Sequence, residues 1–131
     1  MFIDASAIIA IMADEADRLL LSKRLAQASE TFVSPIVVYE ATTGLARRRA
    51  CSIAEAESLV DAFVDEVRAT MVDISVDIAR EACRAFGRFG RGKHKAELNM
   101  GDCFSYACAR ACDSPLLFKG NDFIHTDIAM A

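Results

Sequence analysis

Short apolar runs alternate with longer amphipathic stretches along the whole chain. Four of these runs have the length and composition of buried strands, at residues 1–3, 31–34, 70–74 and 116–118. The last six residues are a candidate for a further edge strand. Because strands separated by helices join through right-handed crossovers, this pattern predicts a parallel sheet covered on both faces. We therefore predict one α/β domain over residues 1–131, with a parallel sheet of about four or five strands flanked by helices.

The stretches between these runs have helical periodicity and helix start signals. Helices are predicted over residues 6–13, 15–28, 35–48, 53–69, 76–86 and 99–112. Ser6 is a candidate N-cap, Pro35 follows the capping hydroxyl of Ser34, and Ser52 forms a capping box with Glu55. The apolar face of the helix after Ser52 predicts six buried residues, namely Ile53, Ala56, Val60, Phe63, Val64 and Val67.

The amino-acid composition indicates the cellular compartment of the protein and argues against a membrane span. The chain is 53% hydrophobic and 26% charged, which is typical of a globular domain with a core. Its five cysteines are odd in number and form no CxxC, so we interpret them as reduced, mostly buried thiols in a cytoplasmic protein. No basic segment precedes the first apolar residues, which argues against a signal peptide. No apolar run reaches the roughly 18 residues that a membrane span needs, so no membrane partner is expected.

The net charge of −4 is unusual for a protein that handles nucleic acid, but the basic residues are clustered. One cluster is Arg47–Arg49. The other runs from Arg84 to Lys95, and no acid lies between Glu81 and Glu97. Within it, the glycines at positions 87, 90 and 92 are expected to end the helix and open a flexible basic loop. Each cluster can be a solvated helix end or loop, or a surface that binds phosphates.

Four acidic residues are candidates for one site, and three of them fall at predicted strand ends or adjoining helix starts. Asp4 directly follows the first strand, and Asp122 follows the fourth strand by a few residues. Asp102 lies at the start of a helix. Glu40 lies inside the helix that begins at Pro35, in an apolar stretch where a carboxylate needs a partner, a metal or a raised pKa. Because ligands of open α/β sheets bind at the carboxyl ends of the strands, we expect these acids to converge there.

Each acid also has an ordinary structural explanation. Asp4 can be a helix-start residue, and Glu40 can lie on an exposed helix face. Asp102 can cap its own helix, and Asp122 can belong to an Asn-Asp turn. The joint pattern points to chemistry more strongly than any single acid. Convergent carboxylates suit a hard cation such as Mg²⁺ or Mn²⁺, which activates water and stabilises the charge on a phosphodiester.

No other catalytic set competes with the acids. The chain has only two histidines, His94 and His125, and both lie in loop-like contexts. It has no GxxxxGK[ST] segment, and the glycines at 87, 90 and 92 neither match GxGxxG nor follow a strand. The residues therefore favour metal-dependent hydrolysis of a phosphodiester over triad or P-loop chemistry.

Four short motifs, taken in order and spacing, resemble a known family. They are Phe2–Ser6, Ser34–Glu40, Leu98–Ala107 and Leu117–Phe123, and Thr126 with Asp127 also fits the family's ending. In these segments the chain resembles, from end to end, a PIN-domain protein of the VapC-like toxins from bacterial type II toxin–antitoxin modules. The resemblance implies a PIN-like nuclease domain over residues 1–131. It also implies a homodimer and a small cognate antitoxin whose tail lies over the active site.

The resemblance assigns the metal site and the reaction. It implies an endoribonuclease that uses Mg²⁺ or Mn²⁺ to hydrolyse RNA by activated water. Asp4, Asp102 and Asp122 are expected to bind the cation, and Glu40 to complete the shell or orient the nucleophilic water. Asp127 is left out of the site, because it could equally begin an edge strand.

Further residues are assigned supporting roles. Ser6 matches the small hydroxyl residue that supports the first acid, and Asn99 the polar residue beside the third. The basic loop with Arg91, Lys93 and Lys95 is expected to hold RNA phosphates.

Two other classes of protein remain as alternatives. A receiver-like signalling domain also gathers acids at a doubly wound sheet, and Asp73 lies near the place of its phosphoacceptor, but the acid pair expected after the first strand is missing. A phosphatase with an Asp-x-Asp nucleophile fails because position 6 is serine. The second class is a catalytically silent binding module of the same fold, which the absence of divalent metal binding would favour.

Overall fold

Four short strands form one parallel sheet, in the order β3-β2-β1-β4. The computed structural model describes residues 1–131, and its strands are β1 (Phe2–Ile3), β2 (Phe32–Val33), β3 (Thr70–Met71) and β4 (Leu116–Leu117). Phe2 of β1 lies opposite Phe32 of β2 on one side and Leu116 of β4 on the other. Chain order reverses on the two sides of β1, which makes the carboxyl end of this central strand the expected place for a ligand.

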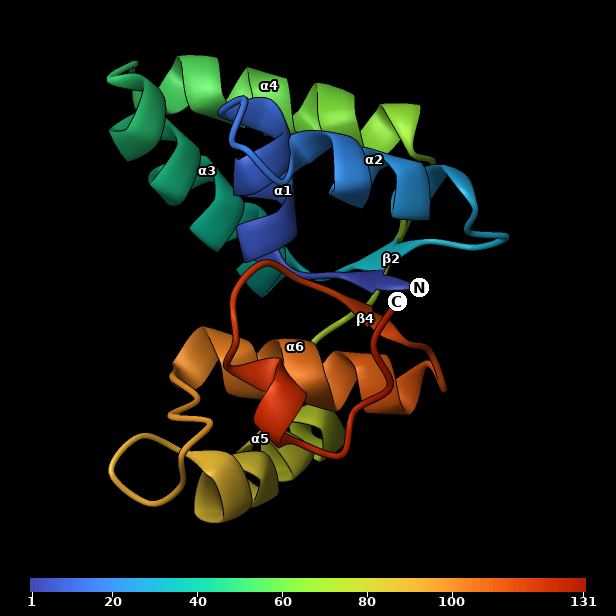
Figure 1. The fold of residues 1–131 in the computed structure, drawn as a ribbon, viewed down its shortest axis with the longest axis vertical. Helices are drawn as coiled ribbons and strands as arrows, with labels where there is room; N and C mark the ends of the chain where they lie inside the picture. Colours follow the sequence, from blue (N-terminus) through green and yellow to red (C-terminus); the bar gives the residue numbers. More distant parts are fainter.

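Helices cover both faces of the sheet, as the alternating pattern predicts. They are α1 (Ala5–Met12), α2 (Arg18–Ala26), α3 (Pro35–Arg49), α4 (Ile53–Glu66), α5 (Val76–Phe89) and α6 (Met100–Ala111), followed by the 3₁₀ helix η1 (Phe123–His125). The first four helices lie on one side of the strands, and α5 with α6 on the other (Figure 1). The prediction of one α/β domain with a parallel sheet of about four or five strands is therefore confirmed, and the sheet has four. None of the helices combines the length and hydropathy that crossing a membrane requires.

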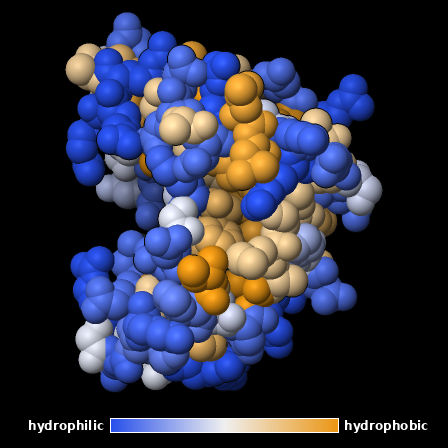
Figure 2. All heavy atoms as spheres, viewed as in Figure 1, coloured by the Kyte–Doolittle hydropathy of each residue, from blue (hydrophilic) through white to orange (hydrophobic).

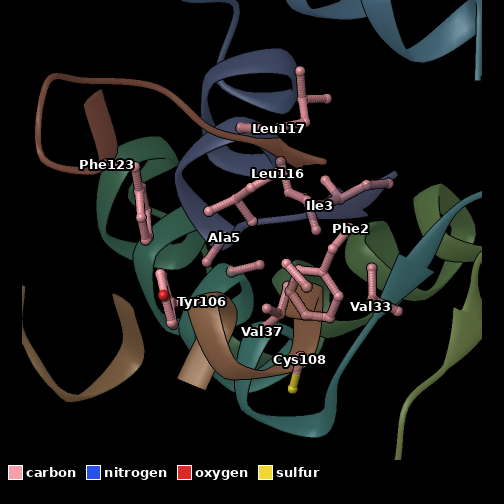
Figure 3. Packing of buried hydrophobic residues seen from close by; sticks show 14 of the residues in the cluster. Phe2, Ile3, Ala5, Val33, Val37, Tyr106, Cys108, Leu116, Leu117 and Phe123 are labelled. Carbon is pink, nitrogen blue, oxygen red and sulfur yellow. The ribbon is translucent and has the colours of Figure 1, made fainter. Parts of the chain in front are cut away.

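The core lies between the sheet and the two helical layers. Side chains of β1 and β4 are fully buried, in one cluster that also includes Tyr106 and Cys108 of α6 (Figure 3). Burying a large apolar side chain contributes roughly 1.5–3 kcal/mol, so this layer holds the short strands in place. All five cysteines are free; Cys103 and Cys108 are buried, whereas Cys83 is exposed.

Element boundaries differ from the prediction where neighbouring elements end early. The third strand stops at Met71 and not at residue 74, because its neighbour β2 ends at Val33 and α3 begins two residues later. The segment expected to be helical from residue 15 becomes helical only at Arg18, after a left-handed residue at Asp14. The last residues form no strand beyond an isolated bridge between Leu116 and Met130.

Helices α4 and α5 each differ from the prediction in one detail. Ile53 is 55% exposed and not buried, because it is the first residue of α4 and precedes the part of the helix that packs on the core. Helix α5 does not end at Phe86. Gly87 is accommodated inside the helix, which continues to Phe89 and is capped by Gly90.

The basic segment after α5 is closed at its base. The N–H of Arg91 donates to the carbonyl of Leu98, and the N–H of Leu98 donates to the carbonyl of Phe89, both at 3.0 Å. Inside the loop, Ala96 is buried and its N–H donates to Nδ1 of His94 at 3.1 Å. Backbone hydrogen bonds and a buried alanine thus give this glycine-containing loop a defined shape.

Candidate active site

Asp4 is a buried carboxylate with a complete set of hydrogen-bond donors. It is the N-cap of α1, and only 4% of its surface is exposed. Its Oδ2 accepts hydrogen bonds from the N–H of Ser6 at 2.9 Å and from Oγ of Ser6 at 2.5 Å. Ser6 was expected to cap this helix, but it lies inside α1 and Asp4 is the cap. A short β-strand followed by an N-capping aspartate thus fixes the first acid at the sheet edge.

Ser105 is a site residue that sequence reasoning missed. It is 1% exposed, and its Oγ donates to Oδ1 of Asp4 at 2.6 Å. Ser105 lies one helical turn after Asp102 on α6, so one face of that helix presents both residues to the site. The signal in the sequence is a hydroxyl residue within the otherwise apolar stretch Cys103–Ala109, but only the fold gives its partner.

Asp102 caps α6 and also faces the acidic cluster. Its Oδ2 accepts the N–H of Asn99 at 2.9 Å while its own N–H donates to Oδ1 of Asn99, which makes a reciprocal capping box. Burial raises the pKa of Asp102 to about 6, and the hydrogen bond from Asn99 opposes this rise. The charges of Asp4 and Asp122 raise the pKa further, whereas the charge of Arg91 lowers it. Asp102 therefore belongs to the capping box of α6 and also lies within the field of the other acids.

Glu40 reaches the cluster from α3. It is partly buried, and burial, followed by the charges of Asp4 and Asp102, raises its pKa to about 7. Its carboxylate lies against Gly101, where a Cβ would fall 2.0 Å from Oε1. The exposed-face explanation is therefore wrong for Glu40, and Gly101 has no side chain where the carboxylate needs room.

Asp122 completes the set from the loop after β4. It is exposed and precedes η1, but its side chain makes no capping hydrogen bond with that helix. The nearby turn requires Gly120, which has φ +106°. The charge of Asp122 acts on Asp102, which places the two carboxylates in the same electrostatic neighbourhood.

Asp127 has a different surrounding. Its Oδ1 accepts the hydroxyl of the buried Tyr106 at 2.6 Å, and its Oδ2 pairs with Arg88 at 3.0 Å. The hydroxyl of Tyr106 and the guanidinium of Arg88 lower the pKa of Asp127. This carboxylate attaches the C-terminal segment to α5 and α6, which agrees with leaving it out of the site. Asp73, the place of a receiver phosphoacceptor, is exposed beyond β3.

The four acids come from elements that meet at one edge of the sheet. Asp4 follows β1 and Asp122 follows β4, while Asp102 lies on the first turn of α6 and Glu40 on the second turn of α3. These element ends face the same side of the molecule in Figure 1, and the space-filling outline narrows there between the two helical layers (Figure 2). A cavity of about 660 Å³ between α2 and α4 is lined by none of these acids.

The chemistry of the donors fits a hard divalent cation. The cluster presents carboxylate oxygens only, which are the ligands that Mg²⁺ and Mn²⁺ prefer. Burial, and after it the charges of the neighbouring acids, raises the pKa of Glu40 and of Asp102, so added positive charge would be stabilised here. No three acidic, histidine or cysteine side chains have the spacing of a ready-made metal site. A cation would therefore be held partly through water, or after small side-chain movements.

The three basic residues of the loop differ in how they act on the acidic cluster. Arg91 is exposed, and its charge lowers the pKa of Asp102, so it lies beside the cluster. The ammonium of Lys93 is 5.9 Å from the ring centroid of Phe86 on α5. Lys95 is exposed. Of the three predicted RNA-binding residues, Arg91 is the one whose field reaches the acids.

Comparison with known proteins agrees with this architecture. The PIN domain family matches residues 1–129. The chain is 39% identical to a VapC ribonuclease of Rhizobium meliloti, over 97% of this chain and 98% of that protein. It is 37% identical to ribonuclease VapC42 of Mycobacterium tuberculosis, over 100% of this chain and 98% of that protein. The chain therefore belongs to the PIN-domain family and, within it, to the VapC ribonucleases.

Two solved structures share the fold. VapC20 of Mycobacterium tuberculosis, described as a sarcin-ricin loop cleaving toxin, superposes with a TM-score of 0.76 at 19% identity, covering 99% of this chain and 97% of that one. A chain from a toxin–antitoxin complex of Klebsiella pneumoniae gives a TM-score of 0.72 at 16% identity, with 99% and 95% covered. The predicted resemblance is confirmed for the family and the fold.

Proposed function

We propose that this protein is the endoribonuclease toxin of a toxin–antitoxin module and hydrolyses RNA phosphodiesters with Mg²⁺ or Mn²⁺ at Asp4, Asp102 and Asp122. The observation that carries the proposal is the raised pKa of two carboxylates, Glu40 at about 7 and Asp102 at about 6, caused by burial and by the other acids. Strongly perturbed carboxylates grouped at the switch point of a parallel sheet are typical of catalytic sites. The ribonuclease names of the curated relatives support the substrate.

The proposed roles of the site residues are cation binding and proton transfer. A bound divalent ion supplies a Lewis acid for the phosphodiester and lowers the pKa of a nearby water. Asp4, Asp102 and Asp122 would hold this ion, and the hydroxyls of Ser6 and Ser105 fix the orientation of Asp4. Glu40 has a pKa near neutral pH, so it can accept a proton from the attacking water.

RNA would approach along the side of the cluster that carries the basic loop. Arg91, Lys93 and Lys95 place three positive charges on one exposed loop, whose Arg91 lies beside the acids, and this suits a polyanionic strand. We place the protein in the cytoplasm, where its five free cysteines would remain reduced.

The proposed protein partners are a cognate antitoxin and a second copy of the chain. A groove of about 320 Å³ between α5 and α6 supports a protein contact, since it is lined only by apolar residues, including the exposed Phe86 and Met100. We assign this groove to the homodimer. Sedimentation equilibrium of the wild type and of Phe86→Glu should show a dimer and a monomer, respectively. An unchanged dimer combined with lost antitoxin binding would move the antitoxin to this surface.

Cleavage of a pool of structured RNAs by the purified toxin, freed of antitoxin, tests the enzyme. The assay is run with Mg²⁺, with Mn²⁺ and with EDTA, beside Asp4→Asn and Asp102→Asn. Cleavage that requires metal and vanishes in both variants supports the proposal. No cleavage, together with Mn²⁺ affinity that is equally negligible in wild type and variants, favours the silent binding module. The lack of a ready-made metal geometry is the observation that keeps this alternative.

A further inference from the structure

A nearly buried glutamate outside the acidic cluster connects three of the chain segments on which the clustered acids lie. Glu15 lies between α1 and α2, and its side chain is 13% exposed. Oε1 accepts hydrogen bonds from Nε and Nη2 of Arg48, at 3.1 and 2.5 Å. Oε2 accepts a hydrogen bond from Nζ of Lys119. Both oxygens of one sheltered carboxylate are therefore paired with cations from distant parts of the chain.

Lys119 is attached to the active site through its backbone as well as to Glu15 through its side chain. Its N–H donates to Oγ of Ser6 at 3.0 Å, and the same hydroxyl donates to Oδ2 of Asp4. Lys119 directly precedes the turn at Gly120, and the loop reaches Asp122 two residues later. The ammonium of Lys119 also lies 3.9 Å from Asp17, so its charge is surrounded by acids.

The other partner of Glu15 belongs to the helix that carries Glu40. Arg48 lies in the last turn of α3, and its side chain is 59% exposed, whereas Lys119 is 35% exposed. The Lys119 contact is thus the more sheltered of the two, and ion pairs lose less of their strength to solvent when they are sheltered. Asp102 is fixed independently by its capping box with Asn99.

From this arrangement we infer that Glu15 is a positioning residue, which holds the Lys119–Asp122 loop against Ser6 and so sets Asp122 relative to Asp4. The cavity between α2 and α4 and the groove between α5 and α6 hold no comparable polar network. Glu15 touches neither substrate nor cation in this role. It acts through Lys119, as the outer-shell partners of metal ligands do, whose loss typically lowers metal affinity roughly 10- to 100-fold.

The test compares Glu15→Gln and Lys119→Met with Arg48→Met. The first two variants remove the charge pairing between Glu15 and Lys119, whereas Arg48→Met removes the other cation from the same carboxylate and leaves the loop attached. Amide hydrogen exchange is measured on the full chain without metal, and Mn²⁺ binding is measured by calorimetry. We expect faster exchange at residues 119–123 and about tenfold weaker Mn²⁺ binding for the first two variants. Arg48→Met should change neither quantity by more than about twofold.

A second set of variants separates positioning from general destabilisation. In an Asp122→Asn background, Glu15→Gln should weaken Mn²⁺ binding no further, because its effect passes through Asp122. An additive loss in that background, or unchanged exchange at residues 119–123 in Glu15→Gln, would overturn the inference. The inference rests on the proposed metal site. Wild-type protein that binds no Mn²⁺ would refute both, while normal Mn²⁺ binding in Glu15→Gln and Lys119→Met would refute only the role of Glu15.

Discussion

The carboxylate of Glu40 occupies the space where a side chain at residue 101 would lie. A Cβ built on Gly101 falls 2.0 Å from Oε1 and 2.2 Å from Oε2 of Glu40, although the two residues belong to different helices, α3 and α6. A helix normally favours alanine over glycine by about 1 kcal/mol. The glycine at this position therefore has its reason in the neighbouring carboxylate and not in the helix.

Replacing Gly101 with alanine should separate stability from activity. The methyl group would push the Glu40 carboxylate away, because the clashing atoms are the end of a flexible side chain and can move. We expect the variant to fold with nearly wild-type thermal stability and to lose RNA cleavage by about 100-fold, which is within the usual contribution of a general base. Cleavage rates and thermal melting, measured on the same preparation, check this.

Gly87 provides a matched control for that substitution. It lies inside α5, and a Cβ there meets nothing within 4 Å. Gly87→Ala should stabilise the protein by roughly 0.5–1 kcal/mol and leave cleavage unchanged. Full activity of Gly101→Ala would show that the position of Glu40 is not critical.

Stability of the metal-free protein should fall as the pH rises through neutrality. The pKa values of Glu40 and Asp102 are raised from 4.5 and 3.8 to about 7 and about 6, so the folded state binds more protons than the unfolded state between these limits. Unfolding free energy therefore decreases with pH across this window. We expect a melting temperature lower at pH 8 than at pH 6 by a few degrees, roughly the shift produced by 1 kcal/mol.

Two comparisons assign that pH dependence to the cluster. Glu40→Gln should flatten most of the curve between about pH 7 and 8, where Asp102, with its lower pKa, is already largely ionised. Glu57→Gln removes the same charge from the exposed surface of α4 and controls for net charge. Saturating Mg²⁺ should also reduce the loss at high pH, because it favours the ionised carboxylates. An identical slope in wild type and Glu40→Gln would contradict the assignment.

Much of the fold was predictable because local chemistry and tertiary structure agree. Ser34 with Pro35, Ser52 with Glu55, and Asn99 with Asp102 are start signals that the structure realises as caps of α3, α4 and α6. The apolar runs at the strands become the buried centre of the sheet. Strand lengths were less predictable, because they depend on where the neighbouring strand ends.

The acids of the candidate site and their local supports, Ser6 and Asn99, were visible in the sequence, but the supports that lie far away along the chain were not. Asp4 and Asp122 stand out because each follows a strand, which places them at the sheet edge before any contact is known. Ser105 lies 101 residues from its partner Asp4, and Glu15 lies 104 residues from Lys119. Such pairs depend on how helices dock on the sheet, and helical periodicity contains no information about the partner.

Removing the hydroxyl of Ser105 should weaken both the fold and the site. Ser105→Ala leaves Oδ1 of the buried Asp4 without its only donor, and an unsatisfied buried carboxylate oxygen costs about 1–3 kcal/mol. Denaturant unfolding should show this loss, accompanied by weaker cleavage that Ser105→Thr partly restores. Ser114→Ala, which removes a hydroxyl bonded only to the carbonyl of Cys112, should have a smaller effect on stability and none on cleavage. Equal effects of the two substitutions would rule out a special role for Ser105.

The basic loop should contribute to RNA affinity through charge and not through metal binding. Lys93 and Lys95 are exposed, and neither influences the pKa of Glu40 or Asp102, so replacing both with glutamine removes phosphate contacts while the acids keep their field. We expect weaker RNA binding at low salt, a salt dependence shallower by about one unit for each lost contact, and unchanged Mn²⁺ affinity. Arg47→Gln with Arg49→Gln, at the far end of α3, removes the same charge and should leave RNA binding nearly unchanged. If both pairs weaken RNA binding equally, net charge and not the loop determines affinity.

Arg91→Gln should differ from both pairs, because losing the charge that lowers the pKa of Asp102 would alter Mn²⁺ binding as well as RNA binding.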